Sequence, residues 1–470
     1  MHTKLKKIFF IFGGITAAVV LAMVIFILML NMNNYRARIE AVASEATGMK
    51  VRIDGKIKLS LFPRPCLSFE NILIQNRGMN VASAKKAKAG IGLLPLLRRE
   101  ILIQQISLIS PTFNITKDRR GLLNLEPPEK KPAVPFVVKK IIIKEGRILY
   151  FDEKSNGKSE AKECDFTAQN LSVGGGEFLS ALSFDGRLSC GEVKTKKWRI
   201  SNLTAAIKAR KDRFESDPFT MRVLGGNGTG AIKAVTRGKS LEYSLDFSIT
   251  KFRFEEVLGT FQQKKSIRGE LDMESHISMK GKNIDEMTRT AQGEVSLSGQ
   301  NILLESLDLD SFLEKYERSR NVNLVDVGAF LFVGPLGALL TKGYDFGSVY
   351  KESLGGKSTI RKLVSDWRVK NGIAEAEDVA FVTRKNRVAL KGRLNFVHDR
   401  FEDLRVAILD AKGCAIYSQR INGDFNKPRI DKPSAIHSLI GPIISLAKKP
   451  IEMLDWDKCE IFYRGSLKHP

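Results

Sequence analysis

Apolar and polar residues alternate with a period of two along much of this chain. In residues 241–249 every odd position is apolar and every even position is polar. This period places one face of a β-strand in apolar surroundings and the other face in water. Residues 51–61, 271–279 and 388–396 repeat the pattern. The pattern therefore predicts a mainly β protein.

Turn signals separate these runs and predict antiparallel neighbours. They are Asp54-Gly55, Glu145-Gly146, Asp185-Gly186, Gly225-Gly226-Asn227-Gly228, Asn371-Gly372 and Asn422-Gly423. Short turns of this kind join consecutive strands as hairpins. The glycine cluster 225–230 has no Lys-Ser/Thr pair behind it, so a hairpin is a better interpretation than a phosphate-binding loop.

The apolar face of the predicted sheet has no helix layer to cover it. Between residues 49 and 304 no long segment has apolar residues at i, i+3, i+4 and i+7, the spacing of an amphipathic helix. The sheet must therefore close into a barrel or sandwich, or curl into a long trough with an apolar interior. The residue pattern alone leaves a dry core and an open trough equally supported.

The apolar positions of three predicted strands are our candidates for the lining of such a trough. They are Val51, Ile53, Ile57, Leu59, Leu61, Leu241, Tyr243, Leu245, Phe247, Ile249, Leu271, Met273, Ile277 and Met279. Aliphatic and aromatic side chains solvate acyl chains by removing apolar surface from water, at ~25 cal/mol per Å². This chemistry requires no specific hydrogen-bonding site.

Residues 8–30 form an uninterrupted apolar run that follows Lys4, Lys6 and Lys7. A helix of about 23 residues is roughly 35 Å long, enough to cross a hydrocarbon core of ~30 Å. The run is too long for a signal peptide, so we expect an uncleaved signal anchor. The lysines favour a cytoplasmic N-terminus, with the bulk of the chain on the other side of the membrane.

Three further helical segments are predicted. Residues 34–47 continue from the anchor, with Ile39, Val42, Ala43 and Ala46 on one side. Residues 307–342 and 435–454 carry apolar stretches too short or too interrupted for a second span. We expect these segments to pack over the end or mouth of the sheet.

A Pro-rich segment at 126–136 favours extended, unpaired backbone. We expect it to separate an N-terminal module from the central strands. The predicted segments are 1–34 (cytoplasmic tip and anchor), 35–125 (N-terminal β module), 126–136 (linker), 137–305 (central β-sheet), 306–360 (helical insertion), 361–433 (C-terminal β region) and 434–470 (final helix and strand).

The chain carries a formal net charge of +24, which raises nucleic acid as a partner. The basic residues are spread along the chain and alternate with apolar positions, so no nucleic acid is expected; a surface beside anionic lipid head groups has the same reason to be basic. Five isolated histidines and the absence of HExxH, GxSxG and GxxxxGK[ST] argue against an enzyme. We expect no catalytic residue, cofactor or metal.

The five cysteines are Cys66, Cys164, Cys190, Cys414 and Cys459, and none lies in a CxxC pair. A zinc site is therefore not expected. In an oxidising compartment we expect one or two disulfides and a buried free thiol. Cys414 with Cys459 is the preferred pair, although sequence alone does not assign connectivity.

The segments 47–63, 67–74, 93–97, 109–113 and 118–124 resemble, in this order, the opening of AsmA-like proteins. The first contains Thr47-Gly48, a strand, Gly55, a second strand and Phe62-Pro63. The segments 326–343, 367–383 and 423–428 are similar to the C-terminal part of the same family. No single motif is specific, but their order together with the anchor is.

The resemblance implies an inner-membrane-anchored protein of a Gram-negative bacterium, with its bulk in the periplasm and a role in outer-membrane biogenesis. It also implies a long curled antiparallel β-sheet that carries phospholipid or other acyl lipids, which favours the open trough. Partners would be the inner membrane, lipid, and outer-membrane or periplasmic assembly proteins. The alternative is an envelope scaffold, or a regulator of outer-membrane protein assembly, that binds no lipid.

Overall fold

The computed structural model describes residues 32–60, 65–91, 103–125, 136–173, 182–196, 198–237, 240–260, 267–305, 308–311, 313, 356–431, 434–435 and 461–470. Within these ranges the protein is mainly β, as predicted, with few helices. The predicted anchor, 8–30, lies outside them. Among the residues described, no helix is both long and apolar enough to span a membrane.

The chain divides into two compact units. The N-terminal unit comprises Met1–Lys196 and Asn202–Asp212, and the C-terminal unit comprises Lys197–Ser201 and Arg213–Pro470. The strand β9 (Arg199–Arg210) contributes residues to both units.

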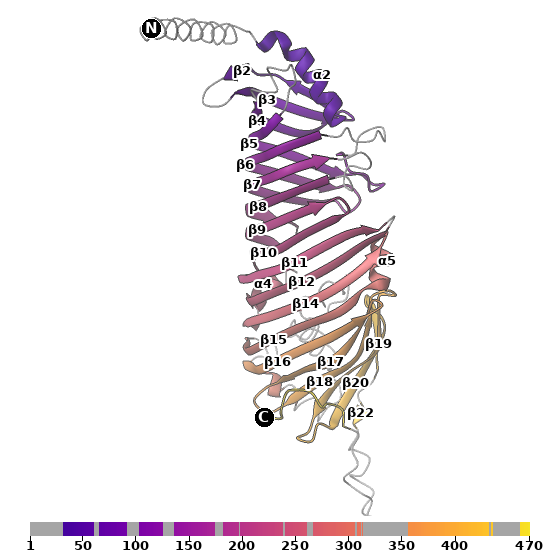
Figure 1. The fold of residues 1–470 in the computed structure, drawn as a ribbon. Coiled ribbons are helices and arrows are strands. Elements are labelled where there is room, and N and C mark those ends of the chain that lie inside the picture. Colours follow the sequence, from indigo (N-terminus) through magenta and orange to yellow (C-terminus); the bar gives the residue numbers. More distant parts are fainter. Residues whose placement is uncertain are drawn as a thin grey trace, which may run out of the picture. The chain divides into compact units, whose positions relative to one another are not determined.

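The N-terminal unit is built from one layer of strands with a helix at its first edge (Figure 1). Its elements are η1 (Met32–Tyr35), α2 (Arg36–Thr47), β1 (Lys50–Ile53), β2 (Ile57–Ser60), β3 (Cys66–Asn76), β4 (Met79–Ile91), β5 (Ile103–Lys117), β6 (Phe136–Asp152), β7 (Gly157–Val173) and β8 (Leu182–Lys194). Both β1 and β2 pair with β3, and each later strand to β8 pairs with the one before it. No described ladder joins β8 back to β1 or β2, so this sheet is open as predicted.

The sheet departs from the predicted antiparallel order at one place. β5 and β6 are parallel, with Gln105 opposite Lys140 and Lys117 opposite Asp152. The 18 or so residues between them are long enough for the chain to return to the start of β5, which a parallel neighbour requires. The predicted linker 126–136 lies in this connection and, except for Phe136, outside the described residues. The strands on its two sides are direct neighbours in one sheet.

The C-terminal unit is a second open run of strands. Its elements are β10 (Arg213–Val223), β11 (Gly226–Arg237), β12 (Ser240–Arg253), α4 (Phe254–Thr260), β13 (Ile267–Arg268), β14 (Glu270–Gly281), α5 (Ile284–Thr290), β15 (Gln292–Leu304), β16 (Ser358–Lys370), β17 (Ile373–Val382), β18 (Arg387–Asn395), β19 (Arg400–Leu409), β20 (Ala415–Asp424), β21 (Lys427–Ile430) and β22 (Ser434–Ala435). The ladders described here are antiparallel, with β13 beside β15, and β21 and β22 both beside β20.

Two clusters of buried apolar side chains lie in the C-terminal unit. The larger, which we call the main core, includes Phe252, Leu271, Leu363 and Phe381, together with Leu309 from the helical residues 309–311. The smaller, the strap cluster, is Ala380, Val382, Ala389, Ala407, Leu409, Ala415, Tyr463 and Leu467. Residues 461–470, the C-terminal segment, supply the last two members.

The strands predicted at 241–249, 271–279 and 388–396 are confirmed within β12, β14 and β18. The glycine cluster at 225 is confirmed as a hairpin. Leu224 and Gly225 have φ values of 53° and 78°, the left-handed conformations of a type I′ turn between β10 and β11.

Four other turn signals are wrong. The chain does not reverse at Asp54-Gly55, because β1 and β2 run in the same direction along β3. Asn422-Gly423 lies inside β20, still paired with β21. Glu145-Gly146 lies inside β6, where Glu145 has φ 53° and forms a β-bulge rather than a turn. Asp185-Gly186 lies inside β8. A side chain at Gly186 would meet the rings of Phe184 and Phe166, at 2.9 and 3.1 Å from its first carbon. This glycine makes room for aromatic packing and does not reverse the chain.

The predicted helix at 34–47 is confirmed as α2, preceded by the single turn η1. Its proposed apolar side is not buried, because Val42 is 61% exposed. Most of the predicted helices 307–342 and 435–454 lies outside the described residues, but Ala435 itself is in β22. Leu309 and Leu313 are fully buried in the main core, as expected for a helix packed against the sheet.

Candidate functional site

The register of the N-terminal sheet gathers apolar side chains onto one face. Residues directly opposite each other on paired strands point to the same side. One such row runs from β2 to β8 through Ile57, Phe69, Ala87, Leu108, Ile143, Phe166 and Leu188. The next row contains Leu59, Leu67, Ala89, Ile106, Ile141 and Ala168. We call this side of the unit the apolar face.

Bulged residues keep the apolar face continuous along each strand. Asn71, Ser110, Glu145 and Glu163 have φ values of 49–53° and interrupt β3, β5, β6 and β7. Each extra residue shifts the alternation by one position. Ile72 and Ile74, for example, then lie on the same side as Leu67 and Phe69, although their numbers are even.

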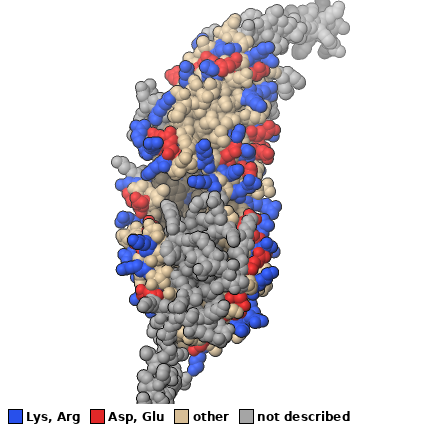
Figure 2. All heavy atoms as spheres, turned by 180° about the vertical axis from the view of Figure 1, so that it is seen from behind, with Lys and Arg blue, Asp and Glu red and all other residues tan. Residues whose placement is uncertain are grey.

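The apolar face is only partly covered. Phe69, Leu108, Ile143, Phe166 and Leu188 are all half-buried. Neither the main core nor the strap cluster contains a described residue of this unit. Figure 2 shows one face of the N-terminal unit with a band of uncharged residues and charged side chains along its flanks. The apolar face is therefore accessible to a ligand.

Along β4 the apolar face carries small side chains. The four side chains that β4 contributes are all alanine, at 82, 84, 87 and 89. Their neighbours on β3 and β5 are mostly larger, such as Phe69 and Leu108. Because alanine adds only a methyl group, β4 carries smaller side chains than the strands on its two sides, and Ala82, Ala84 and Ala87 are buried between these larger neighbours.

A disulfide ties two strands together on the same face. Cys164 on β7 and Cys190 on β8 are direct register partners, with their Cα atoms 4.1 Å apart. Both are buried, at 3% and 4% exposed. The expectation of a disulfide is confirmed, but this pair was not the one preferred from sequence. The free thiol of Cys66 is half-buried rather than buried.

Cys414 is disulfide-bonded. Its predicted partner, Cys459, lies outside the described residues, so the Cys414–Cys459 pairing stays a prediction. Cys414 also forms a β-bridge with Ile461.

The structure places the predicted lining residues of β1 and β2 at the start of the apolar face. Val51, Ile53 and Ile57 are buried, with 8%, 4% and 3% of their surface exposed. Leu59 is half-buried, and Leu61 lies outside the described residues. A ligand would reach Leu59 more readily than the other three.

The predicted lining residues of β12 and β14 share one face of the C-terminal unit. Leu245 lies opposite Ile277, Tyr243 opposite Met279, and Ile249 opposite Met273. They differ in burial along the strand. Ile249 and Leu271 belong to the main core, Phe247 and Met273 pack against it, and Leu241, Tyr243, Leu245, Ile277 and Met279 are half-buried.

Sequence reasoning missed most of the central apolar face. Ile106 and Leu108 do alternate with Gln105 and Ser107, so a signal was present there. In β6 the run Ile141-Ile142-Ile143 hides the alternation, because Ile142 points to the opposite face, where it pairs with Ser107 and Thr167. Only the pairing of β6 with β5 and β7 shows which of these three isoleucines lie on the apolar face.

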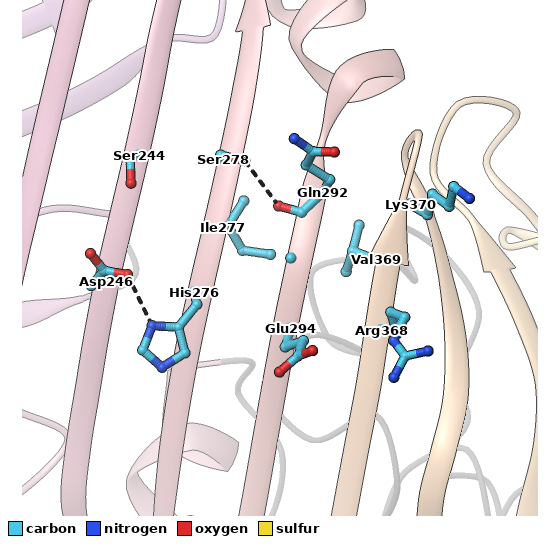
Figure 3. A pocket seen from close by; sticks show the side chains of 11 residues that line it. Ser244, Asp246, His276, Ile277, Ser278, Gln292, Glu294, Arg368, Val369 and Lys370 are labelled. Carbon is cyan, nitrogen blue, oxygen red and sulfur yellow. Dashed lines mark hydrogen bonds and ion pairs between the residues drawn. The ribbon is translucent and has the colours of Figure 1, made fainter.

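A depression of ~490 Å³ with mostly polar lining residues lies over β12, β14, β15 and β16 of the C-terminal unit (Figure 3). It is lined by Ser244, Asp246, His276, Ile277, Ser278, Gln292, Gly293, Glu294, Arg368, Val369 and Lys370. The His276 Nδ1 and Asp246 Oδ1 atoms are 2.9 Å apart, and this hydrogen bond raises the pKa of His276. Both side chains are more than half exposed, so the pair resembles a surface ion pair more than a catalytic dyad.

A pair of acidic residues lies nearby in the register. Asp366 on β16 is opposite Asp378 on β17, and burial, followed by the charges of Asp378 and other carboxylates, raises the pKa of Asp366. Asp378 is already engaged by the C-terminal segment, whose Ser466 amide donates to it at 2.9 Å. Among the described residues, no group of three or more His, Cys, Asp and Glu side chains could hold a metal ion.

Comparison with known proteins supports the resemblance seen in the sequence. No curated protein and no solved structure matches the chain. The model of the AsmA family matches residues 1–187, which include the strands β1–β7 of the apolar face and part of β8. The match does not extend to the segments near residues 326–428 that also resembled this family. Over residues 1–187 the chain is therefore similar to the AsmA family.

Proposed function

We propose that the apolar face of the N-terminal unit holds the acyl chains of phospholipid or a similar lipid and assists lipid movement toward the outer membrane. The observation that carries this proposal is an apolar face whose larger side chains, such as Leu108, Ile143 and Phe166, are only half-buried and belong to neither of the two core clusters. The match of residues 1–187 to the AsmA family fits a role in envelope and outer-membrane biogenesis in general.

The proposed mechanism is passive. Acyl chains lie along the rows of apolar side chains while head groups stay in water at the charged flanks. Each methylene group removed from water contributes about 0.8 kcal/mol, so a chain in contact over several strands is held without any specific hydrogen bond. The predicted anchor at 8–30 would place the protein in the inner membrane with its bulk in the periplasm.

In this proposal the N-terminal unit holds the lipid, and the rest of the chain does not. In the C-terminal unit, Phe252, Leu271 and Phe381 are at most 1% exposed, which is the burial of a dry core. That core supports the second candidate function, an envelope scaffold without lipid, for this unit. Phe247 is a poor probe of lipid binding because it stacks on Phe219 at 5.8 Å and packs against the core.

The test uses two adjacent residues on opposite faces of β6. A photoreactive amino acid is introduced at position 143, on the apolar face, or at position 142, on the opposite face, in the full chain. After irradiation in cells, mass spectrometry identifies the adducts. We expect lipid adducts at 143 and few or none at 142, because the two side chains differ only in the face to which they point.

Lipid extraction from the purified protein gives a second readout. We expect Ile143→Asp to lower the amount of co-purifying phospholipid and Ile142→Asp to leave it unchanged, with circular dichroism showing that both variants fold. Equal adduct yields at the two positions, or a folded protein free of lipid, would favour the scaffold.

A further inference from the structure

The first edge of the N-terminal sheet carries backbone groups that no described strand satisfies. β1 and β2 both pair with β3 on one side only. Along an edge strand, the N–H groups of alternate residues point outward and attract strands of other molecules. On this edge the outward N–H groups include those of Val51, Ile53 and Ile57.

Side chains of η1 and α2 bind these outward groups. The amide of Val51 donates to Ser44 Oγ at 2.9 Å, the amide of Ile53 to Glu40 Oε1 at 2.6 Å, and the amide of Ile57 to Asn33 Oδ1 at 3.1 Å. Between the two strands, the carbonyl of Gly55 accepts from Arg36 at 2.8 Å. These are the positions at which a neighbouring strand would hydrogen-bond.

The four side chains form one stripe along the helix. Asn33, Arg36, Glu40 and Ser44 are spaced by three, four and four residues, which places them on one side of a helix with 3.6 residues per turn. The helix therefore meets the sheet edge with a polar stripe. Val42 points outward, at 61% exposed, which an apolar docking stripe would not allow.

The edge that the helix occupies is basic. Lys50, Arg52, Lys56 and Lys58 are exposed along β1 and β2, with Asp54 the one acidic residue among residues 50–58. Like charges on two such edges repel each other across a strand pair. An extended segment with acidic side chains is the partner whose charge fits this edge.

We propose that η1 and α2 act as a substitute strand that closes this edge against strand addition by an acidic extended segment. The polar stripe takes up the hydrogen bonds that such a segment would otherwise make. This inference concerns the edge of the sheet and holds whether or not the apolar face carries lipid.

Hydrogen exchange at single amides tests the proposal in the full chain, purified in mild detergent. We expect Glu40→Ala to speed exchange of the Ile53 amide by about ten- to a hundredfold, the range for loss of a hydrogen bond to a charged group. Glu40→Gln keeps an acceptor oxygen and should restore most of the protection. Glu45→Ala changes an exposed residue on the same helix and serves as the control. Unchanged exchange at Ile53 in Glu40→Ala would overturn the proposal.

Strand addition is then measured directly with a labelled ten-residue peptide of alternating valine and glutamate. We expect the triple variant Asn33→Ala/Glu40→Ala/Ser44→Ala to bind the peptide and the unmodified chain not to bind it. Binding should weaken with salt, as required by the basic edge. Equal binding to both proteins, or no binding to a variant whose three amides exchange freely, would show that the stripe does not guard this edge.

Discussion

The phenol of Tyr463 donates a hydrogen bond to the carboxylate of Asp378, which lies 85 residues earlier in the chain. The same carboxylate accepts from the amide of Ser466 at 2.9 Å. Arg387 adds a bond to the carbonyl of Leu467 at 3.0 Å. Together these contacts hold the C-terminal segment over the strap cluster, where four alanines let it approach the sheet closely.

We expect Tyr463→Phe to lower the free energy of unfolding by about 1.5–3 kcal/mol, the range for a hydrogen bond to a charged group. Tyr463 is 5% exposed, so water does not replace the lost donor. Denaturant unfolding measures the change. In a double-mutant cycle, Asp378→Asn should have a smaller effect in the Tyr463→Phe background than in the unmodified chain. Additive effects would mean that the two side chains are not coupled.

The same pair has a defined pH dependence. Burial and then the hydrogen bond to Asp378 raise the pKa of Tyr463 above its ordinary value. The folded state therefore binds the phenolic proton more tightly than the unfolded state, and the resulting stability is present below the unfolded pKa of ~10 and lost as the pH rises. We expect the difference between the unmodified chain and Tyr463→Phe to shrink in that alkaline range.

The stabilisation by Asp403 depends on pH in the opposite direction. Hydrogen bonds from Arg420 and Arg405, the latter at 3.1 Å, lower the pKa of its carboxyl group. Its stabilisation is therefore present above the unfolded pKa of ~3.9 and is lost as the pH falls through the lower folded value. We expect Asp403→Asn to lower stability at pH ~7 by no more than about 1 kcal/mol, because the side chain is 49% exposed and water screens the pair.

Unfolding of Asp403→Asn at pH ~7 and pH ~3 checks this sign. Asparagine also tolerates the φ of 47° at this position, so the substitution removes the charge without adding backbone strain. The two proteins should converge in stability at the lower pH. A difference that grows on acidification would contradict the assignment.

Strands with strict alternation could be predicted from the sequence because burial on one side is a local property. Residues 241–249 are such a case, and the structure confirms them within β12. The contents of the apolar face could not be predicted in the same way. Ile141, Ile142 and Ile143 look alike in sequence, and only their partners on β5 and β7 decide which face each one occupies.

The helix at 34–47 shows a second limit. Its existence follows from local sequence, but its orientation does not. The apolar residues suggested a buried side that includes Val42, whereas the structure turns Glu40 and Ser44 toward β1. Backbone amides on an edge strand that lack a hydrogen-bond acceptor attract polar side chains. A pattern based on hydrophobicity does not show where such amides lie.

The β-bulges are also hidden from the alternation pattern, and one of them offers a test of backbone strain. Lys251 has φ 53° and lies where the β12–β14 register shifts between Ile249 and Phe252. A non-glycine residue in this left-handed region is less stable by roughly 1–2 kcal/mol, whereas glycine adopts it freely. The side chain of Lys251 is exposed, so its removal takes nothing from the core.

We expect Lys251→Gly to raise the free energy of unfolding by about 0.5–1 kcal/mol, after the extra flexibility of glycine in the unfolded chain is subtracted. Thermal and denaturant unfolding measure the gain. Lys251→Ala removes the same charge but keeps the first side-chain carbon, so it should bring no stabilisation. The amide of residue 251 donates to Asp272 Oδ1 at 2.7 Å and can do so in both variants. A gain of equal size in the alanine variant would assign the effect to the lysine side chain, and the strain at this bulge would then be negligible.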